Sequence, residues 1–238
     1  MDNNIPLGDS ELQTITLESN AAAVNYHAWL CSMALPYLGP DPLELGSGLG
    51  DYAQTWLDGG LGQIAISEVE PQRRQLLQSR FQDDPRVRLV SVDLSREEPA
   101  EYSSVVSFNV MEHVPDDKLA FRAAHALLRS GGYLVTFAPA FPFAMSKFDR
   151  SVGHVRRYTV DSIRAGYVAA GFQIEEARYY NAPGLLAWFV GMRLLGLTPK
   201  ASATLSVWDE HVVPRARSWE SRHTMPFGQS VLCVGRKI

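Results

Sequence analysis

Three glycines at alternate positions follow a short apolar segment and precede a helix-like pattern. Pro42–Leu45 has the character of a strand, and Gly46, Gly48 and Gly50 lead into residues 51–58, where apolar side chains recur at helical spacing. Glycine at such a turn allows a positive φ and lets a ligand approach the backbone, while the helix N-terminus offers free N–H donors. Because a plain strand-to-helix turn needs only one glycine, three of them predict a ligand-binding loop.

Strand-like and helix-like segments alternate along the chain around this loop. Further strands are predicted at residues 63–67, 87–92, 104–108, 133–137, 172–180 and 230–235. Helices are predicted around residues 21–38, 72–81, 117–128 and 159–170. This alternation predicts an α/β, Rossmann-like, doubly wound fold. Its seven-stranded sheet would be mostly parallel, with an antiparallel terminal strand.

We expect a single domain over residues 1–238, with added segments around one core. The cofactor-binding core is placed at about residues 40–139. Lid or cap segments are placed at about 1–39, 140–158 and 182–227, the last of these a largely helical insert.

Composition sets outer limits on function. The 238 residues carry a formal charge of −4, which argues against a dedicated nucleic-acid-binding protein. Cys31 and Cys233 lie far apart without a CxxC pair, so neither a disulfide framework nor a metal site is expected. The most apolar run, residues 182–192, is shorter than the ~18 residues that a membrane span needs. With no signal-peptide pattern at the N-terminus, we expect a soluble, cytoplasmic protein.

The spacing of the glycine loop departs from the dinucleotide fingerprint. That fingerprint is Gly-x-Gly-x-x-Gly, whereas here the third glycine comes one residue early and Asp51 follows it. An added acid would sit badly beside a pyrophosphate. Since Glu44 and Asp51 flank the loop, the pattern favours a ligand with a positive centre over a nicotinamide dinucleotide.

Here the sequence resembles the class I S-adenosylmethionine-dependent methyltransferases, whose first motif is acid-x-Gly-x-Gly-x-Gly. The resemblance implies that S-adenosyl-L-methionine is the cofactor and S-adenosyl-L-homocysteine the product. It implies that the loop holds the methionyl part through Glu44, Gly46, Ser47, Gly48 and Gly50.

The same resemblance implies an acid at the end of the second strand that binds the ribose hydroxyls. Glu68 follows Gly48 by 20 residues, which matches the expected interval, and Val69 comes next. Glu70 is the lesser candidate, and at least one of the two acids is expected to be solvated.

Two further segments extend the resemblance. Asp93 and Leu94, after the third strand, resemble the element that recognises adenine. Asn109 and Val110 begin Asn-x-x-Glu-His, a fourth motif typical of methyltransferases with small-molecule substrates. It differs from the Asn/Asp-Pro-Pro-Tyr motif, which makes DNA and some protein substrates less favoured.

The acceptor side offers His113, His154 and Tyr158 as candidate catalytic residues. His113 ends the fourth motif, where the ligand crevice of such a sheet lies. It is either a general base or a structural histidine. Residues 146–164 hold five basic and two acidic side chains, so this segment is either a lid for an acidic acceptor or one whose arginines pair with nearby acids such as Glu112 or Asp149.

The N-terminal helix and the insert contain apolar and aromatic groups. Tyr26 and Trp29 either lie over the cofactor, where aromatic faces suit a sulfonium, or pack in the core. The apolar residues 183–192 could line the acceptor pocket, contact a lipid, form a homodimer face or pack as a buried cap.

The expected function is therefore methyl transfer to a small organic acceptor, for example in secondary metabolism, on nitrogen, oxygen or carbon. One alternative is a methyltransferase of a cell-envelope glycan or lipid. Another is a non-methylating binding module or cyclase that uses S-adenosylmethionine on this scaffold.

Overall fold

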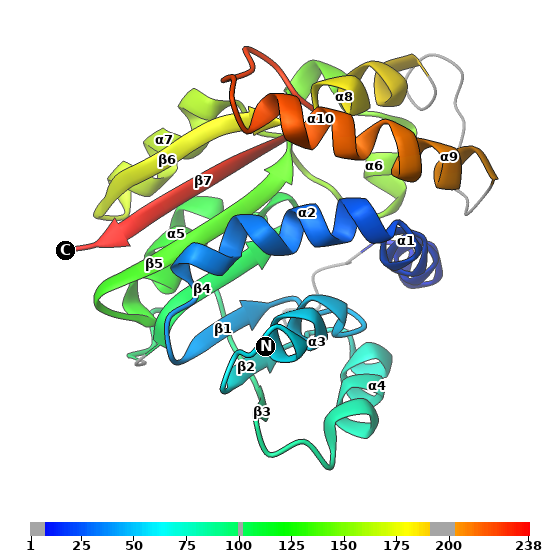
Figure 1. Ribbon diagram of the computed structural model, residues 1–238. Helices are drawn as coiled ribbons and strands as arrows, with labels where there is room; N and C mark the ends of the chain where they lie inside the picture. Colours follow the sequence, from blue (N-terminus) through cyan, green and yellow to red (C-terminus); the bar gives the residue numbers. More distant parts are fainter. Residues whose placement is uncertain (1–7, 100–101, 191–202) are drawn as a thin grey trace.

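The structure is a computed structural model that describes residues 8–99, 102–190 and 203–238 (Figure 1). Its centre is a seven-stranded sheet in the order β3-β2-β1-β4-β5-β7-β6. The strands are β1 (Pro42–Leu45), β2 (Ile64–Ser67), β3 (Val87–Val90), β4 (Tyr102–Phe108), β5 (Leu128–Pro139), β6 (Phe172–Tyr180) and β7 (Ser230–Lys237). The first five pair in parallel, and β7 runs antiparallel to both of its neighbours. The predicted Rossmann-like sheet with its antiparallel terminal strand is confirmed.

Helices cover both faces of this sheet. On one face, α2 (Val24–Ala34), α3 (Asp51–Asp58), α4 (Pro71–Phe81) and α10 (Val213–Glu220) share a buried cluster with the sheet (Figure 1). On the other face lie α5 (Asp117–Ala126) and α7 (Val160–Ala169). Neighbouring residues of one strand belong to the apolar clusters on opposite faces of the sheet, as Val105 and Val106 do in β4. A parallel sheet buried on both faces has this near-continuous apolar pattern.

Some predicted boundaries differ from those observed. The predicted helix at 117–128 ends at Ala126, because Leu128 already pairs with Tyr102 as the start of β5. The predicted helix at 21–38 is α2 followed by a short 3-10 turn, Leu35–Tyr37. A separate helix, α1 (Ser10–Ala22), precedes it.

Several shorter elements surround the ends of β4 and β5. They are the 3-10 turns η2 (Met111–His113) and η3 (Pro142–Ala144) and the helices α6 (Lys147–Ser151), α8 (Ala182–Trp188) and α9 (Ala203–His211). Both α1 and α6 lie beyond the end of the sheet toward which β5 runs, at the right of Figure 1. Part of the predicted apolar segment, residues 191–192, lies outside the described residues. None of the helices within the described ranges has the length and apolar character of a membrane span.

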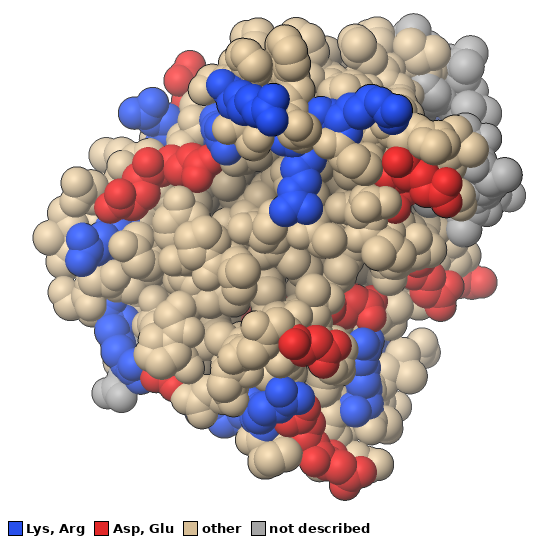
Figure 2. Space-filling model, in the orientation of Figure 1, with Lys and Arg blue, Asp and Glu red and all other residues tan. Residues whose placement is uncertain are grey.

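Charged side chains are distributed unevenly over the surface. Figure 2 shows small groups of Lys and Arg on the upper part of one face, and others next to acidic side chains at its left and in its lower part, with neutral surface between them. Positive and negative side chains are thus interspersed on this face.

Candidate functional site

The glycine loop connects β1 to α3. Gly46, Gly48 and Gly50 have φ values of 62°, 56° and 85°, a region that side chains other than glycine rarely adopt. The space around the loop is also restricted. A Cβ on Gly48 would lie 2.9 Å from Leu17 of α1, and one on Gly46 would lie 2.6 Å from Val110. The loop is therefore bounded by the N-terminal helix on one side and the residues after β4 on the other.

Glu44 lies beneath this loop and is 2% exposed. Its Oε2 has no hydrogen-bond partner among the described residues. Burial raises the pKa of its carboxyl to about 8, and a hydrogen bond from Ser47 only partly opposes this. A cationic group bound at the loop would supply the missing partner. The buried carboxyl of Glu44 therefore fits a cofactor with an ammonium and a sulfonium.

Glu68 at the end of β2 is tied to the same loop. Its Oε2 accepts from the Gly48 N–H at 2.9 Å, and its Oε1 accepts from the N–H groups of Val69 (2.8 Å) and Glu70 (2.9 Å). The Arg73 Nε lies 3.5 Å from Glu68 Oε2. The Glu68 carboxylate thus ties the end of the second strand to the glycine loop, beside the hydrogen bond from the Ser47 N–H to the Ser67 carbonyl at 2.8 Å.

Glu70 has a different role from its neighbour. Its carboxylate caps α4, accepting from the N–H groups of Gln72 (3.1 Å) and Arg73 (2.7 Å). The expectation that at least one of the two acids is solvated is wrong, because Glu68 and Glu70 are 6% and 9% exposed. Both are buried because backbone N–H groups satisfy their oxygens.

The adenine candidates Asp93 and Leu94 follow β3, and the fourth-motif candidate Asn109 follows β4. Asp93 accepts from the Ser95 N–H (2.9 Å) and hydroxyl (2.6 Å), and this hydrogen bonding lowers the pKa of its carboxyl. Leu94 packs at the edge of the second apolar cluster. Asn109 adopts a φ of 54°, and its N–H donates to the Phe137 carbonyl at 2.8 Å.

Of the two aromatic candidates of α2, Trp29 lies in the core and Tyr26 packs against it. Trp29 is buried, and its ring meets those of Tyr26 and Tyr180 edge to face at 6.4 and 6.0 Å between centroids. Burial raises the pKa of Tyr26 to about 12. These contacts are those of core packing, with Tyr26 only partly buried against the cluster.

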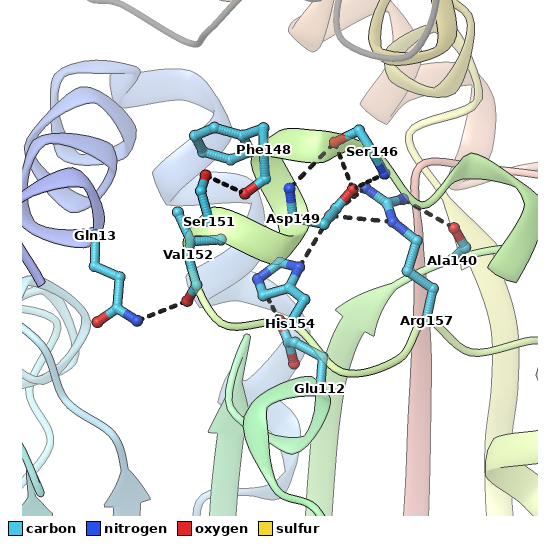
Figure 3. A network of polar contacts seen from close by, with 10 residues as sticks. All are labelled: Gln13, Glu112, Ala140, Ser146, Phe148, Asp149, Ser151, Val152, His154 and Arg157. Carbon is cyan, nitrogen blue, oxygen red and sulfur yellow. Dashed lines mark hydrogen bonds and ion pairs between the residues drawn. The ribbon is translucent and has the colours of Figure 1, made fainter. Parts of the chain in front are cut away.

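The segment after η3 is built around the buried Asp149 (Figure 3). Its carboxylate accepts from the Ser146 N–H (2.6 Å) and from Arg157 Nη2 (2.8 Å), and its Oδ1 lies 2.9 Å from His154 Nδ1. Burial alone would raise the pKa of Asp149, but these partners hold it below the usual range. Of the two expectations for this segment, internal pairing is therefore the one observed for Arg157.

Tyr158 also faces inward. It is buried, and its hydroxyl lies 3.2 Å from the Met111 carbonyl and 3.0 Å from Asp117 Oδ2. Burial and the Asp117 charge raise its pKa. Arg156 pairs with the same Asp117 at 2.7 Å. These contacts fasten the segment to η2 and α5.

His113 and His154 lie together next to Glu112. Their rings meet edge to face, with centroids 4.7 Å apart. Burial and the neighbouring His154 lower the pKa of His113 to about 3, so His113 is neutral and a weak base. Burial also raises the pKa of Glu112 to about 7.

Sequence reasoning did not single out Leu17 or Arg73, and it considered Glu112 and Asp149 only as ion-pair partners. Glu112 lies inside the recognised fourth motif, and Asp149 was one of two acids in a basic stretch. The sequence therefore carried a signal for both residues, a motif position for Glu112 and an acid within a basic segment for Asp149. Leu17 and Arg73 carry no such signal, since an aliphatic residue on a helix and an arginine on a polar helix are ordinary.

Comparisons with known proteins agree with this geometry. Residues 43–134 match a family model described as a methyltransferase domain. A ubiquinone biosynthesis O-methyltransferase of Xanthomonas campestris pv. campestris (strain B100) is 34% identical over 107 residues, which is 43% of each chain. The alignment thus spans less than half of the curated relative.

Two solved structures share the fold over most of the chain. One is a chain of the complex between the Haloferax volcanii Trm112 methyltransferase activator and the putative methyltransferase. It has a TM-score of 0.63 and 14% identity and covers 96% of this chain and 97% of its own. The other is an S-adenosylmethionine-dependent methyltransferase from Mesorhizobium loti. It has a TM-score of 0.61 and 16% identity, and the match covers 92% of this chain and 100% of its own. Residues 43–134 of this chain are therefore similar to a methyltransferase domain, and the chain shares the fold of these solved methyltransferase structures.

Proposed function

We propose that the protein transfers a methyl group from S-adenosyl-L-methionine to a small organic acceptor. The observation that carries the proposal is the unpartnered, buried oxygen of Glu44 beneath a loop of three glycines with positive φ. A site of this kind suits a cationic ligand that lies close to the backbone. The word O-methyltransferase in the relative's name favours oxygen as the acceptor atom.

The bound cofactor supplies an activated methyl group on its sulfonium. Glu44 would pair with its positive charge, Glu68 would accept from its ribose hydroxyls, and Asp93 would meet its adenine. Asn109 and Val110, at the end of β4, would close the site beside the loop. Since the leaving group is good, alignment of the reactants contributes most of the catalysis, and such positioning is worth ~7–11 kcal/mol.

Water exclusion would fall to α1 and the segment around α6. The Asp9 N–H donates to the Ser151 carbonyl at 2.8 Å, and the Gln13 side chain donates to the Val152 carbonyl at 2.7 Å (Figure 3). Leu17, on the same helix, lies against Gly48. One helix therefore joins the acceptor-side segment to the cofactor loop, which supports its role as a cover.

The three candidate catalytic residues would divide into two roles. His113 is neutral and half-buried, so it would orient an acceptor hydroxyl by hydrogen bonding and would not act as the base that removes its proton. His154 and Tyr158 are positioning residues, because their polar atoms contact Asp149, Asp117 and the Met111 carbonyl. An acceptor in the cytoplasm and a homodimeric state remain predictions from the sequence.

An exposed apolar surface favours a second candidate, an acceptor with a lipid portion. Phe143, Leu186 and Val190 are 61%, 62% and 51% exposed, and the Phe143 ring lies 6.1 Å from that of Phe189. If these side chains form one contiguous patch, it would suit contact with an apolar acceptor or a lipid surface. Activity only on lipid-linked acceptors, together with association with liposomes, would favour this candidate over a water-soluble acceptor.

Isothermal titration of the full chain with S-adenosyl-L-homocysteine tests the proposal. We expect binding by the wild-type protein and none by nicotinamide dinucleotides. No binding of S-adenosyl-L-homocysteine at millimolar concentration would refute the cofactor assignment. Mass spectrometry of reaction mixtures then tests the chemistry, since a true transfer increases the acceptor mass by one methylene. A mass-neutral product would instead indicate a cyclase.

A further inference from the structure

Glu112 is the most poorly satisfied acid in the described part of the chain. It is 0% exposed, and neither carboxylate oxygen has a hydrogen-bond partner among the described residues. The nearest group able to carry positive charge is His154, whose Nε2 lies 3.8 Å from Glu112 Oε1. A buried carboxylate without partners is costly, so the arrangement points to a cation that completes it.

The two neighbouring histidines present nitrogen atoms to the same place. The Nδ1 of His113 is buried and has no hydrogen-bond partner in the described structure. The Nδ1 of His154 donates to Asp149, which leaves its Nε2 directed toward Glu112 (Figure 3). A histidine whose other ring nitrogen is held by a carboxylate is the arrangement that orients metal-bound imidazoles.

The spacing of these atoms is close to that of a metal site. One ligand atom from each of Glu112, His113 and His154 lies within 4.8 Å of the other two. Nitrogen and oxygen ligands lie about 2.0–2.2 Å from a zinc ion, so they are roughly 3.4 Å apart in a tetrahedral arrangement. Side-chain rotations that move each atom by about 1 Å would bring the three to that distance.

We propose that Glu112, His113 and His154 bind a divalent transition-metal ion of the zinc class. Two imidazoles and one carboxylate suit Zn²⁺ or Co²⁺ better than Mg²⁺ or Ca²⁺, which prefer oxygen ligands. Three protein ligands leave a fourth position open. Because Asp149 and Arg157 neutralise each other nearby, the ion's charge is compensated mainly by Glu112.

The ion would link two parts of the fold. Glu112 and His113 belong to η2, which follows β4, whereas His154 follows α6. A bound ion would therefore fix the segment around α6 to the end of the sheet. This inference reverses the expectation from the cysteine spacing that the chain holds no metal, since the ligands here are histidines and an acid that are distant in sequence.

Binding of Co²⁺ to the untagged, chelator-treated full chain tests the proposal without any cofactor. We expect one ion per chain, visible absorption typical of a four- or five-coordinate site, and displacement of Co²⁺ by Zn²⁺. Glu112→Gln and His154→Ala should each weaken binding at least tenfold. His223→Ala is the matched control, because its imidazole is exposed and contacts only Trp219 among the described residues, and it should bind like wild type.

The outcomes separate the site from its alternatives. If wild-type protein shows no Co²⁺ absorption and no Zn²⁺ heat, the three residues form only a buried ion-pair network and the proposal is overturned, whatever the variants do. Equal loss in His223→Ala would also overturn it, as would Zn²⁺ affinity that Glu112→Gln leaves unchanged. Titration with S-adenosyl-L-homocysteine reports the fold and the cofactor site separately, so failure of either assay does not decide the other.

Discussion

Replacing Glu44 with glutamine is expected to abolish a pH dependence of cofactor binding. In the free protein, burial holds the pKa of Glu44 at about 8, so the carboxyl is mostly protonated at neutral pH. A bound ammonium favours the ionised form, and binding therefore releases one proton. The ionisation of Glu44 should accordingly increase the affinity as pH rises from 6 toward 8.

The size of this effect follows from the pKa. With one proton released and a free-state pKa of about 8, the ionised fraction rises about 50-fold between pH 6 and pH 8. This corresponds to about 2.3 kcal/mol of binding free energy, given ~1.36 kcal/mol for each tenfold change. The glutamine variant should bind more weakly at pH 8 and lack this slope.

Isothermal titration with S-adenosyl-L-homocysteine from pH 6 to pH 8, in buffers of different ionisation enthalpy, measures both affinity and proton release. The ligand's own amino group titrates near pH 8. Its contribution cancels in the ratio of wild-type to Glu44→Gln affinity at each pH. Parallel pH profiles for the two proteins, or wild-type affinity that falls from pH 6 to pH 8, would refute the reasoning.

Three further predictions follow from the same contacts. Gly48→Ala should weaken S-adenosyl-L-homocysteine binding at least tenfold and lower the melting temperature, because φ is +56° there and the added Cβ meets a leucine at 2.9 Å; unchanged titration and melting curves would contradict this. Asp149→Asn should lower the free energy of unfolding in urea by ~3–5 kcal/mol, since it leaves the buried Arg157 without its charge partner; a loss below 1 kcal/mol would refute a structural role for this pair. Glu68→Ala should weaken cofactor binding strongly, whereas Glu70→Ala should mainly cost about 1 kcal/mol of stability through loss of a helix cap; equal effects on affinity would overturn the distinction.

Much of the sheet could be predicted because its signals are local. Short apolar runs separated by helical patterns mark strands that are buried on both faces, and their alternation with helices indicates a mostly parallel sheet. The start of β5 at Leu128 could not be predicted in this way. Gly131 and Gly132 indicate a break, yet Leu128 is held in the strand by its pairing with Tyr102.

The cofactor loop belongs to the part that the sequence by itself determined. Gly46, Gly48 and Gly50 are needed because their backbone angles are positive, and Glu68 lies 20 residues beyond Gly48 because one helix and one strand fill that interval. These are constraints between near neighbours in the chain. These constraints do not depend on how the segments outside the core are arranged.

Only the tertiary structure decided what surrounds the loop. Leu17 reaches Gly48 through the docking of α1, and His154 reaches Glu112 from a segment some forty residues farther along the chain. Tyr158, a candidate at the acceptor, turns inward, where its hydroxyl lies within hydrogen-bonding distance of Asp117 and the Met111 carbonyl. Such contacts depend on how separate elements pack, and no local pattern encodes the final distance between them.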